Sequence, residues 1–306
     1  MENNRIFEEM NIAITGASGF VGVNLQDYLE KTHQINALSV RYKPNQRVEI
    51  KGDAIIHLAG KAHDLKKVSQ SSEYYEANFE LTKQLFDVFL TSDSAVFIFM
   101  STVKAVADEV KGILSEDEVP NPKTHYGISK HQAEDYILSQ ELPEEKRVYI
   151  LRPCMIHGPG NKGNLNLLYQ LVVKGLPWPL GAFENQRSFL SIENLCFIIK
   201  ELLENESIPS GVYQVADDKS LSTNEMIQLL GVSLDKKSNI WSIPVSWIRK
   251  VAKLGDGLHL PLDSERLQKL TENYVVSNQK IVKAIGKSLP VSSEKGLVRT
   301  FESFRK

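Results

Sequence analysis

The sequence has 306 residues and a net charge of −2, with 36 basic and 38 acidic side chains that are well mixed along the chain. No basic stripe indicates a nucleic-acid-binding protein, and no apolar run approaches the roughly 20 residues that span a bilayer. A chain of this length can bury a large core, as α/β folds do.

The two cysteines and the N-terminal residues indicate a reducing compartment. Cys154 and Cys196 lie in apolar runs and have no spacing typical of zinc ligands or of a disulfide framework, so no metal site is expected. Residues 1–9 are too acidic and too weakly apolar for a signal peptide, and they are interpreted as a flexible tail. The protein is therefore expected to be cytoplasmic.

The first predicted strand, near residues 11–15, leads into the glycine-rich segment Thr15-Gly-Ala-Ser-Gly-Phe-Val-Gly22. Glycines after a strand and before a helix, predicted near 20–31, are typical of a phosphate-binding turn. The helix N-terminus supplies N–H groups and a positive dipole end to the phosphates. The spacing GxxGxxG differs from the commoner GxGxxG, and a glycine-rich turn without a ligand is the alternative interpretation.

The second predicted strand, near 35–40, is followed by Arg41, Lys43 and Arg47, with no acidic residue between Thr32 and Arg47. Dinucleotide folds that prefer NAD usually place an acid here for the ribose 2′-hydroxyl, whereas an arginine accommodates a 2′-phosphate. The pattern therefore favours NADP(H) over NAD. The alternative is that these cations are solvated surface charges.

Two hydroxyls follow the predicted strand near 95–100, and a tyrosine–lysine pair follows them. Ser101 and Thr102 stand where ligands bind in open α/β sheets, although such a pair is often only turn chemistry. Tyr126 and Lys130 are four residues apart and share one helix face. The lysine is expected to lower the phenol pKa from its ordinary value of about 10 and prepare it for general acid/base catalysis. An exposed tyrosine with a solvated lysine is the alternative.

Apolar runs and helical patterns alternate through the first 150 residues, with further strands near 54–58 and 148–152 and helices near 71–91 and 125–141. This alternation predicts an α/β fold, a Rossmann-type doubly wound parallel sheet with helices on both faces. Residues 10–152 are expected to form the dinucleotide-binding domain. Residues 153–306 are expected to be mostly a smaller substrate-binding lobe, from which segments such as Gly211–Val215 return to the sheet, and a ligand would bind between the lobes.

Taken together, these motifs resemble the extended short-chain dehydrogenases/reductases of the NAD-dependent epimerase/dehydratase family, from about Met10 to about Arg299. The matching segments are TGASGFVG for TGxxGxxG, DAIIHLAG at 53–60 for the strand beneath the cofactor, Asn78 for the helix asparagine that supports the active site, FIFMST at 97–102, YGISK at 126–130, LRPCMIHGP at 151–159 and RSFLSIENL at 187–195.

The resemblance implies three sets of site residues and no metal. The catalytic candidates are Tyr126, Lys130, Thr102 and Ser101. The cofactor-binding candidates are Gly16, Ser18, Gly19, Phe20, Val21, Gly22, Arg41, Leu58, Ala59, Gly60, Asn78, Lys130 and Pro153. The substrate-binding candidates are Lys61, His63, Lys104, Asn164 and Arg187, of which Arg187 stands at the family's diphosphate arginine.

The reaction implied is hydride transfer between NAD(P) and C4 of a UDP-linked hexose or N-acetylhexosamine. Arg41 favours an NADPH-dependent 4-keto-sugar reductase, with a UDP-glucose or UDP-GlcNAc 4-epimerase that keeps NAD bound as the alternative. A non-catalytic NAD(P) sensor would usually have lost Tyr126 or Lys130. A dehydratase would need an acid and a base after Thr102, where Val-Lys-Ala stands.

Three further expectations concern partners and departures from the family pattern. By analogy, a homodimer would form through the helices near 71–91 and 125–141. A lipid-diphosphate-linked sugar is an alternative substrate. No stretch stands out as a membrane-facing helix, although Trp241 through Leu254 is apolar enough to test.

The chain departs from the family pattern at two positions: Met155 replaces a family asparagine, and His157 replaces a common tyrosine and is interpreted as structural. No clean match to a second nucleotide-binding arginine is found, and Arg266 is the candidate for it.

Overall fold

The computed structural model describes residues 8–45, 48–61, 70–161, 165–258 and 262–305. His63 and Asn164, two of the substrate-binding candidates, lie outside the described residues, as do Arg47 and most of the predicted N-terminal tail.

A six-stranded parallel sheet forms the centre of the fold, in the order β2-β1-β3-β4-β6-β9. Its strands are β1 (Asn11–Thr15), β2 (Gln34–Leu38), β3 (Ala54–His57), β4 (Val96–Met100), β6 (Arg147–Pro153) and β9 (Gly211–Val215). The predicted Rossmann-type fold is confirmed. The late segment Gly211–Val215 pairs with β6 and is the sixth strand of the sheet.

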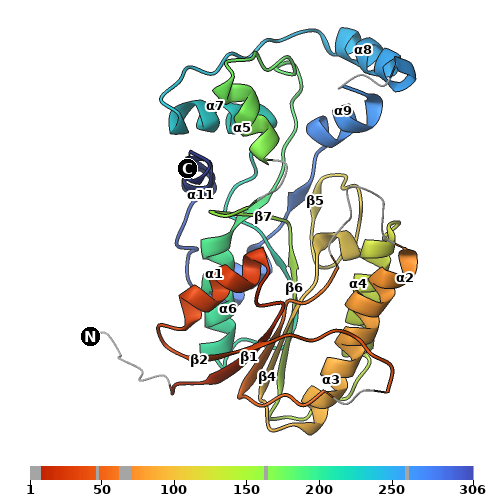
Figure 1. The fold of residues 1–306 in the computed structure, drawn as a ribbon, viewed down its shortest axis with the longest axis vertical. Coiled ribbons are helices and arrows are strands. Elements are labelled where there is room, and N and C mark those ends of the chain that lie inside the picture. The colour runs from red at the N-terminus through yellow and green to blue at the C-terminus, as the bar shows by residue number, and fades with distance from the viewer. Residues whose placement is uncertain (1–7, 46–47, 62–69, 162–164, 259–261, 306) are drawn as a thin grey trace.

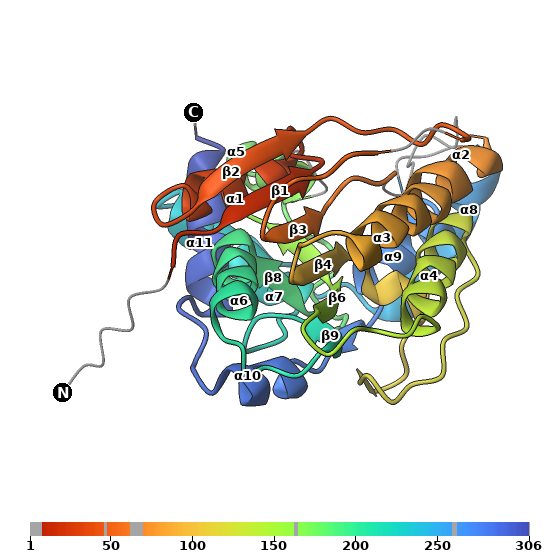
Figure 2. The same ribbon diagram turned by 90° about the horizontal axis from the view of Figure 1, so that it is seen from below.

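Each face of the sheet is covered by helices because the buried strands carry apolar side chains on both faces. On one face, alternate residues such as Ile14, Ile56 and Ile98 pack under α1 (Phe20–Leu29) and α6 (Ile192–Glu204). On the other face, residues such as Ile55 and Phe97 pack under α3 (Leu81–Thr91) and α4 (His125–Leu138). Figure 2 shows these two helical layers on opposite sides of the strands.

The C-terminal part of the chain builds a second region with its own apolar core beyond the carboxyl ends of the strands (Figure 1). Its helices are α5 (Leu165–Val173), α7 (Thr223–Ser233), α8 (Val245–Leu258), α9 (Ser264–Thr271) and α11 (Ser293–Ser303), while α10 (Gln279–Ile285) lies beside β9. Two short parallel pairs lie outside the main sheet: β7 (Met155–His157) with β8 (Phe189–Ser191), and β5 (Ile113–Leu114) with β10 (Val275–Val276). Among the described helices, none is long and apolar enough to cross a membrane.

The predicted helix near 71–91 is interrupted. It consists of α2 (Ser71–Tyr75), a π-helical turn at Glu76–Glu80 and then α3. π-helical turns are rare and occur frequently at functional sites. This one contains Asn78, whose side chain is fully buried and turns toward the loop after β3.

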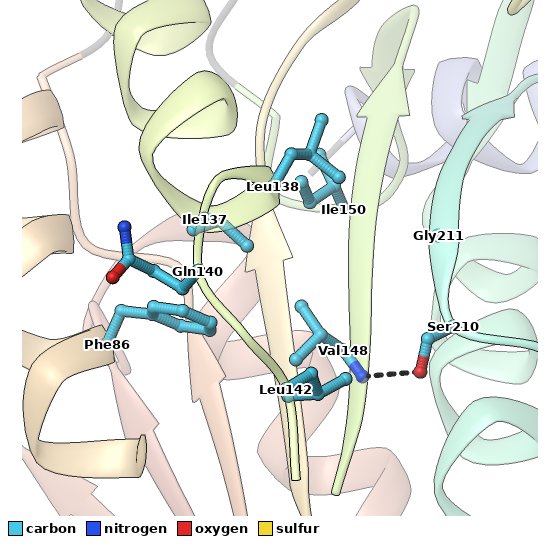
Figure 3. A pocket seen from close by; sticks show the side chains of 9 residues that line it. All are labelled: Phe86, Ile137, Leu138, Gln140, Leu142, Val148, Ile150, Ser210 and Gly211. Carbon is cyan, nitrogen blue, oxygen red and sulfur yellow. Dashed lines mark hydrogen bonds between the residues drawn. The ribbon is translucent and has the colours of Figure 1, made fainter. Parts of the chain in front are cut away.

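A pocket lies at the amino-terminal end of β6, whereas the loop after β3 lies at the carboxyl ends of the strands (Figure 3 shows the pocket). It is lined by Phe86, Ile137, Leu138, Gln140, Leu142, Val148, Ile150, Ser210 and Gly211, and the Val148 amide donates to the Ser210 hydroxyl at 3.0 Å. Ligands in open α/β sheets bind at the carboxyl ends of the strands. This pocket is therefore not a candidate active site.

Candidate active site

The glycine turn after β1 has the shape that a dinucleotide pyrophosphate requires. Gly16 has a φ of +70°, and a Cβ placed on it would lie 2.6 Å from the Ala59 amide nitrogen. A Cβ on Gly22 would lie 2.4 Å from the Gly16 carbonyl oxygen. Gly19 is the N-cap of α1, and no side chain caps that end of the helix. The first-turn N–H groups thus meet a backbone cradle that fits the phosphates of a nicotinamide dinucleotide.

The other cofactor-binding candidates in this turn differ in how far they are exposed. Ser18 is exposed, whereas Phe20 and Val21 are half-buried and pack against the core beneath α1. The adjacent loop after β3 carries Leu58 and Ala59, whose amides donate to the Thr15 backbone carbonyl and hydroxyl at 3.2 Å each. The glycine turn and this loop are therefore held together through Thr15.

His57 supports these loops as a neutral structural residue. Its Nδ1 lies 2.7 Å from the Thr15 hydroxyl and its Nε2 lies 2.9 Å from the Thr82 hydroxyl. Because Thr82 donates its own proton to the Asn78 carbonyl, it accepts from His57 Nε2, and Nδ1 accepts from Thr15. Complete burial, assisted by the Lys130 charge, lowers the pKa of His57.

Asn78 joins the loop after β3 to the tyrosine-bearing helix. Its Oδ1 accepts from the Lys61 amide at 2.7 Å, and its Nδ2 donates to the Lys61 carbonyl and the Ser129 hydroxyl, both at 3.0 Å. A Cβ on Gly60 would lie 2.7 Å from Asn78 Oδ1 and 3.1 Å from Lys130 Nζ. The backbone at Gly60 is thus held directly against two of the predicted site residues.

Tyr126 and Thr102 meet at the carboxyl end of β4. Tyr126 lies in the first turn of α4, which the Thr124 side chain caps by accepting from the Gly127 amide. The Thr102 side chain is close enough to Tyr126 to influence the pKa of its phenol, and Tyr74 packs edge-on against the Tyr126 ring. The structure therefore brings the predicted phenol and hydroxyl to the same end of the sheet.

Lys130 is buried one turn further along α4. Its ammonium donates to the Met100 carbonyl at 2.8 Å and lies 4.7 Å from the centroid of the Phe99 ring. Burial lowers its pKa from an ordinary value of 10.5 to about 8, although the Glu134 carboxylate opposes this shift. Lys130 therefore lies directly behind the strand end that carries Thr102.

The prediction of a lowered pKa for Tyr126 is wrong. Burial raises the pKa of Tyr126, and the only opposing influence identified among the described residues is that of the Thr102 side chain. The spacing of four residues placed the two side chains on one face correctly. A lowered pKa would require that the phenolate of Tyr126 is well stabilised. Burial removes water from the phenolate, and this effect on the pKa is the larger one here.

Ser101 does not point at Tyr126. Its hydroxyl donates to Glu134, a fully buried carboxylate that also accepts from Arg152 Nε at 3.0 and 3.1 Å and from Nη2 at 2.6 Å. Ser101 thus belongs to a buried ion-pair network behind the site. Glu134 stands four residues after Lys130, as Lys130 stands four residues after Tyr126, so the sequence already placed this carboxylate on the same face of the helix.

Two of the substrate-binding candidates, Lys104 and Arg187, line a small pocket beside Thr102. Thr102, Lys104, Pro153 and Arg187 line it, together with Val103, Cys154, Met155, Ser188 and Tyr274. Lys104 Nζ donates to the Asp108 carbonyl and lies over the Tyr274 ring, and burial lowers its pKa. Arg187 also lines a larger, mostly apolar pocket of about 510 Å³, where it is joined by Trp178 and Arg266. Arg187 thus lines both pockets, and its guanidinium donates to the Lys269 carbonyl at 2.8 Å and lies 3.5 Å from the Glu272 carboxylate.

Lys61 lies with the cofactor candidates and not in the pocket beside Thr102. It lines a pocket of about 620 Å³ with Arg41, Ala59 and Gly60, and its ammonium pairs with Glu73. Arg41 is exposed at this pocket, which also contains Glu76. Arg41 thus lies beside the loop after β3, in a pocket that also contains two carboxylates, Glu73 and Glu76.

His157 is buried and packed as a structural residue. Its Nδ1 lies 2.9 Å from the Thr300 hydroxyl, and its Nε2 lies 3.5 Å from Asp217. Trp178 is core, and its indole donates to Asn224. Phe183 packs against the same apolar core of the C-terminal region.

The lowered pKa of Lys130 predicts a pH-dependent stability. Because the folded pKa of about 8 lies below the ordinary 10.5, the unfolded chain binds more protons between these values. The free energy of unfolding of the wild type should therefore rise, relative to Lys130→Met, by about 3 kcal/mol as the pH rises through this range. Denaturant unfolding of both proteins from pH 7 to 10.5 measures this difference. A constant difference would contradict burial of the ammonium.

A family model, the NAD dependent epimerase/dehydratase family, matches residues 12–216. The chain belongs to this family of NAD(P)-binding sugar epimerases, dehydratases and reductases.

Curated relatives of the chain include both epimerases and a reductase. A UDP-glucose 4-epimerase of Vibrio cholerae is 28% identical over 96% of this chain and 95% of that protein. An N-acetyl-alpha-D-glucosaminyl-diphospho-ditrans,octacis-undecaprenol 4-epimerase of Escherichia coli O157:H7 is 29% identical over 76% and 75%. A GDP-6-deoxy-D-mannose reductase of Pseudomonas aeruginosa is 27% identical over 71% and 78%.

Solved structures confirm the fold. The enzyme WbmG of Bordetella bronchiseptica in complex with NAD superposes with a TM-score of 0.73 at 16% identity, covering 100% of this chain and 96% of that one. RMD from Pseudomonas aeruginosa complexed with NADPH superposes with a TM-score of 0.72 at 22% identity, covering 96% and 98%.

Proposed function

We propose that this protein is an NADPH-dependent reductase that acts on the 4-keto group of a UDP-linked hexose or N-acetylhexosamine. The observation that carries the proposal is the position of Tyr126 in the first turn of α4, where Thr102 after β4 influences its pKa, with Lys130 buried one turn further along the helix. A phenol whose pKa is raised stays protonated at neutral pH, which suits the donation of a proton to a ketone oxygen.

The roles of the residues follow from their positions. When bound, a reduced nicotinamide supplies hydride to C4, and Tyr126 donates its proton to the C4 oxygen. Thr102 donates a hydrogen bond where negative charge develops. The Lys130 ammonium, buried one turn further along α4, would offset the negative charge left on Tyr126. These contributions grow as charge builds up, so they favour the transition state over the ground state.

The substrate assignment depends on the pocket beside Thr102. Lys104 and Arg187 present two cations to it, and Arg187 continues into the larger apolar pocket. A guanidinium and an ammonium suit a diphosphate, because charge-assisted hydrogen bonds to phosphate oxygens are strong and can be bidentate for arginine. The apolar pocket next to Arg187 would then receive the nucleoside.

The cofactor assignment depends on Arg41. We expect Arg41→Gln to raise the Kd for NADPH about tenfold, because one charge-assisted phosphate contact is lost, while the Kd for NADH changes little. Fluorescence titration of both cofactors with wild type and variant measures this. Lys43→Gln is the matched control, since Lys43 is also exposed two residues away. Equal binding of NADH and NADPH by the wild type would contradict the role of Arg41.

A 4-epimerase is the second candidate, and the Vibrio cholerae and Escherichia coli relatives favour it. An epimerase regenerates its cofactor and keeps it bound, whereas a reductase takes NADPH from solution. Nucleotide released from the purified, denatured protein distinguishes the two: stoichiometric NAD supports the epimerase, and a site that is filled only by added NADPH supports the reductase. The cytoplasmic location and the homodimer stay predictions.

A further inference from the structure

Helix α8 carries an exposed apolar stripe that no other described element covers. Trp247, Val251 and Leu254 are 67%, 46% and 64% exposed. Their spacing of four and three residues places them on one face of the helix. Trp241, 51% exposed, precedes the helix. Figure 1 shows α8 at the end of the molecule farthest from the sheet. Single exposed apolar residues are common, but a continuous stripe that includes tryptophan marks an interaction surface.

A different face of α8 holds the helix to the protein. Ile248 and Ala252 are buried and belong to the core of the C-terminal region. A Cβ on Gly255 would lie 2.1 Å from the Leu262 carbonyl oxygen, so glycine permits close contact with the segment that leads to α9. Asp256 accepts from the Ser264 amide and hydroxyl, both at 2.7 Å. The helix therefore has two apolar faces, one packed and one exposed.

The polar side of α8 is basic: Lys250 borders the exposed stripe, and Lys253 and Arg249 lie further round the helix. Arg249, Lys250 and Lys253 are all exposed, against one carboxylate, Asp256, which is already hydrogen-bonded to Ser264. Within the described part of the chain, no ion pair was found for these three cations. The whole protein carries a net charge of −2, so this positive charge is a local feature.

A pocket lies beside α9, the helix that packs against α8. It is about 510 Å³, and α9 contributes Arg266, Lys269 and Leu270 to its lining. Leu167 of α5, 71% exposed, lies in the same pocket. Apolar and cationic side chains are thus found on α8 and also in this pocket. Arg187 lines the same pocket and the pocket beside Thr102.

We propose that the outer face of α8 docks on the surface of an anionic phospholipid bilayer. A helix with tryptophan and leucine on one face and lysine and arginine on its polar face lies in the membrane interface, where the apolar side chains insert and the cations meet anionic headgroups. The charge is the reason for choosing a bilayer over a second copy of this chain, because two α8 helices that meet face to face would bring like charges together. The proposal is independent of the reaction at C4.

Co-sedimentation of the full-length protein with vesicles tests the proposal. Vesicles of phosphatidylcholine and phosphatidylglycerol at a ratio of about 3:1 provide the anionic surface, and phosphatidylcholine alone provides the neutral one. The wild type should bind the anionic vesicles more strongly, and added salt should weaken the binding. Trp247→Ser with Leu254→Ser should reduce the partition coefficient by about tenfold or more.

Two further variants separate the contributions and serve as controls. Lys250→Gln with Lys253→Gln should remove most of the preference for anionic vesicles, since the inserted side chains remain. Val119→Ser with Val232→Ser removes two other exposed apolar side chains, 81% and 66% exposed, and should bind like the wild type. An unchanged thermal midpoint and unchanged cofactor binding verify that each variant is folded.

Several outcomes would overturn the proposal. One is a wild type that stays in the supernatant with anionic vesicles, and another is equal binding by the Trp247/Leu254 variant. A third is a change of oligomeric state in that variant, by light scattering, without a change in vesicle binding; this would identify a second copy as the occupant. None of these measurements uses turnover, so they leave the proposed reductase activity to its own tests.

Discussion

Replacement of Tyr126 by phenylalanine should lower kcat for the nucleotide-linked 4-keto sugar by about 10²–10⁴, the range expected when a general acid is lost. The aromatic ring and its edge-on contact with Tyr74 are retained, so the site should keep its shape. Thr102 still caps the short helix after β4 by accepting from the Lys104 amide, and the glycine turn is untouched. The Kd for NADPH should therefore stay within about twofold of the wild type. Steady-state kinetics and cofactor titration measure the two effects.

Tyr75→Phe is the matched control for this variant. Tyr75 lies on the neighbouring helix α2, and its hydroxyl lies 3.1 Å from His125 Nδ1, so the substitution removes a different phenol near the site. Its kcat should resemble that of the wild type. Equal activities of the Tyr126→Phe variant and the wild type would remove Tyr126 from the mechanism.

The second large effect concerns stability and comes from the buried pair of Glu134 and Arg152. Arg152→Met should lower the free energy of unfolding by about 3–5 kcal/mol, because it leaves the Glu134 carboxylate buried with its main counter-charge removed. Burial alone would raise the pKa of Glu134, but His131, Arg152 and Ser101 together hold it below its ordinary value. Urea unfolding at neutral pH measures the loss.

Replacing both partners separates the charge from the packing. The double variant Glu134→Leu with Arg152→Met removes the unpaired charge along with the pair, so most of the lost stability should return. Lys269→Met is the surface control: its partner Glu265 and Lys269 itself are both exposed, and the unfolding midpoint should hardly change. Equal stability of Arg152→Met and the wild type would show that Glu134 is not held as an anion by Arg152.

The elements of the Rossmann half were predictable because their signals are local. Continuous apolar runs such as Phe97–Met100 specify strands buried on both faces, and the glycines at 16 and 22 stand where any Cβ would clash with backbone. Tyr126 and Lys130 follow from helix spacing alone. These features depend on a few neighbouring residues, so the sequence shows them directly.

Other features depend on contacts that sequence spacing does not specify. Lys61 lies with Arg41 and not with Lys104, because the position of the loop after β3 is set by Asn78 from a later π-helical turn. The pKa of Tyr126 rises because of burial in the folded protein, which no motif reports. The apolar character of Trp241 through Leu254 was visible in the sequence, but only the structure distinguishes the covered face of α8 from the exposed one.

The most direct test of the proposed chemistry is isotope transfer. The purified enzyme would be incubated with a UDP-linked 4-keto-6-deoxy-N-acetylhexosamine and with NADPH that carries deuterium at the transferable position of its nicotinamide, and the product would be analysed by NMR. Deuterium at C4 of the product sugar, with oxidation of one NADPH for each sugar reduced, is the predicted result. Unlabelled product, or deuterium at another carbon, would contradict reduction at C4.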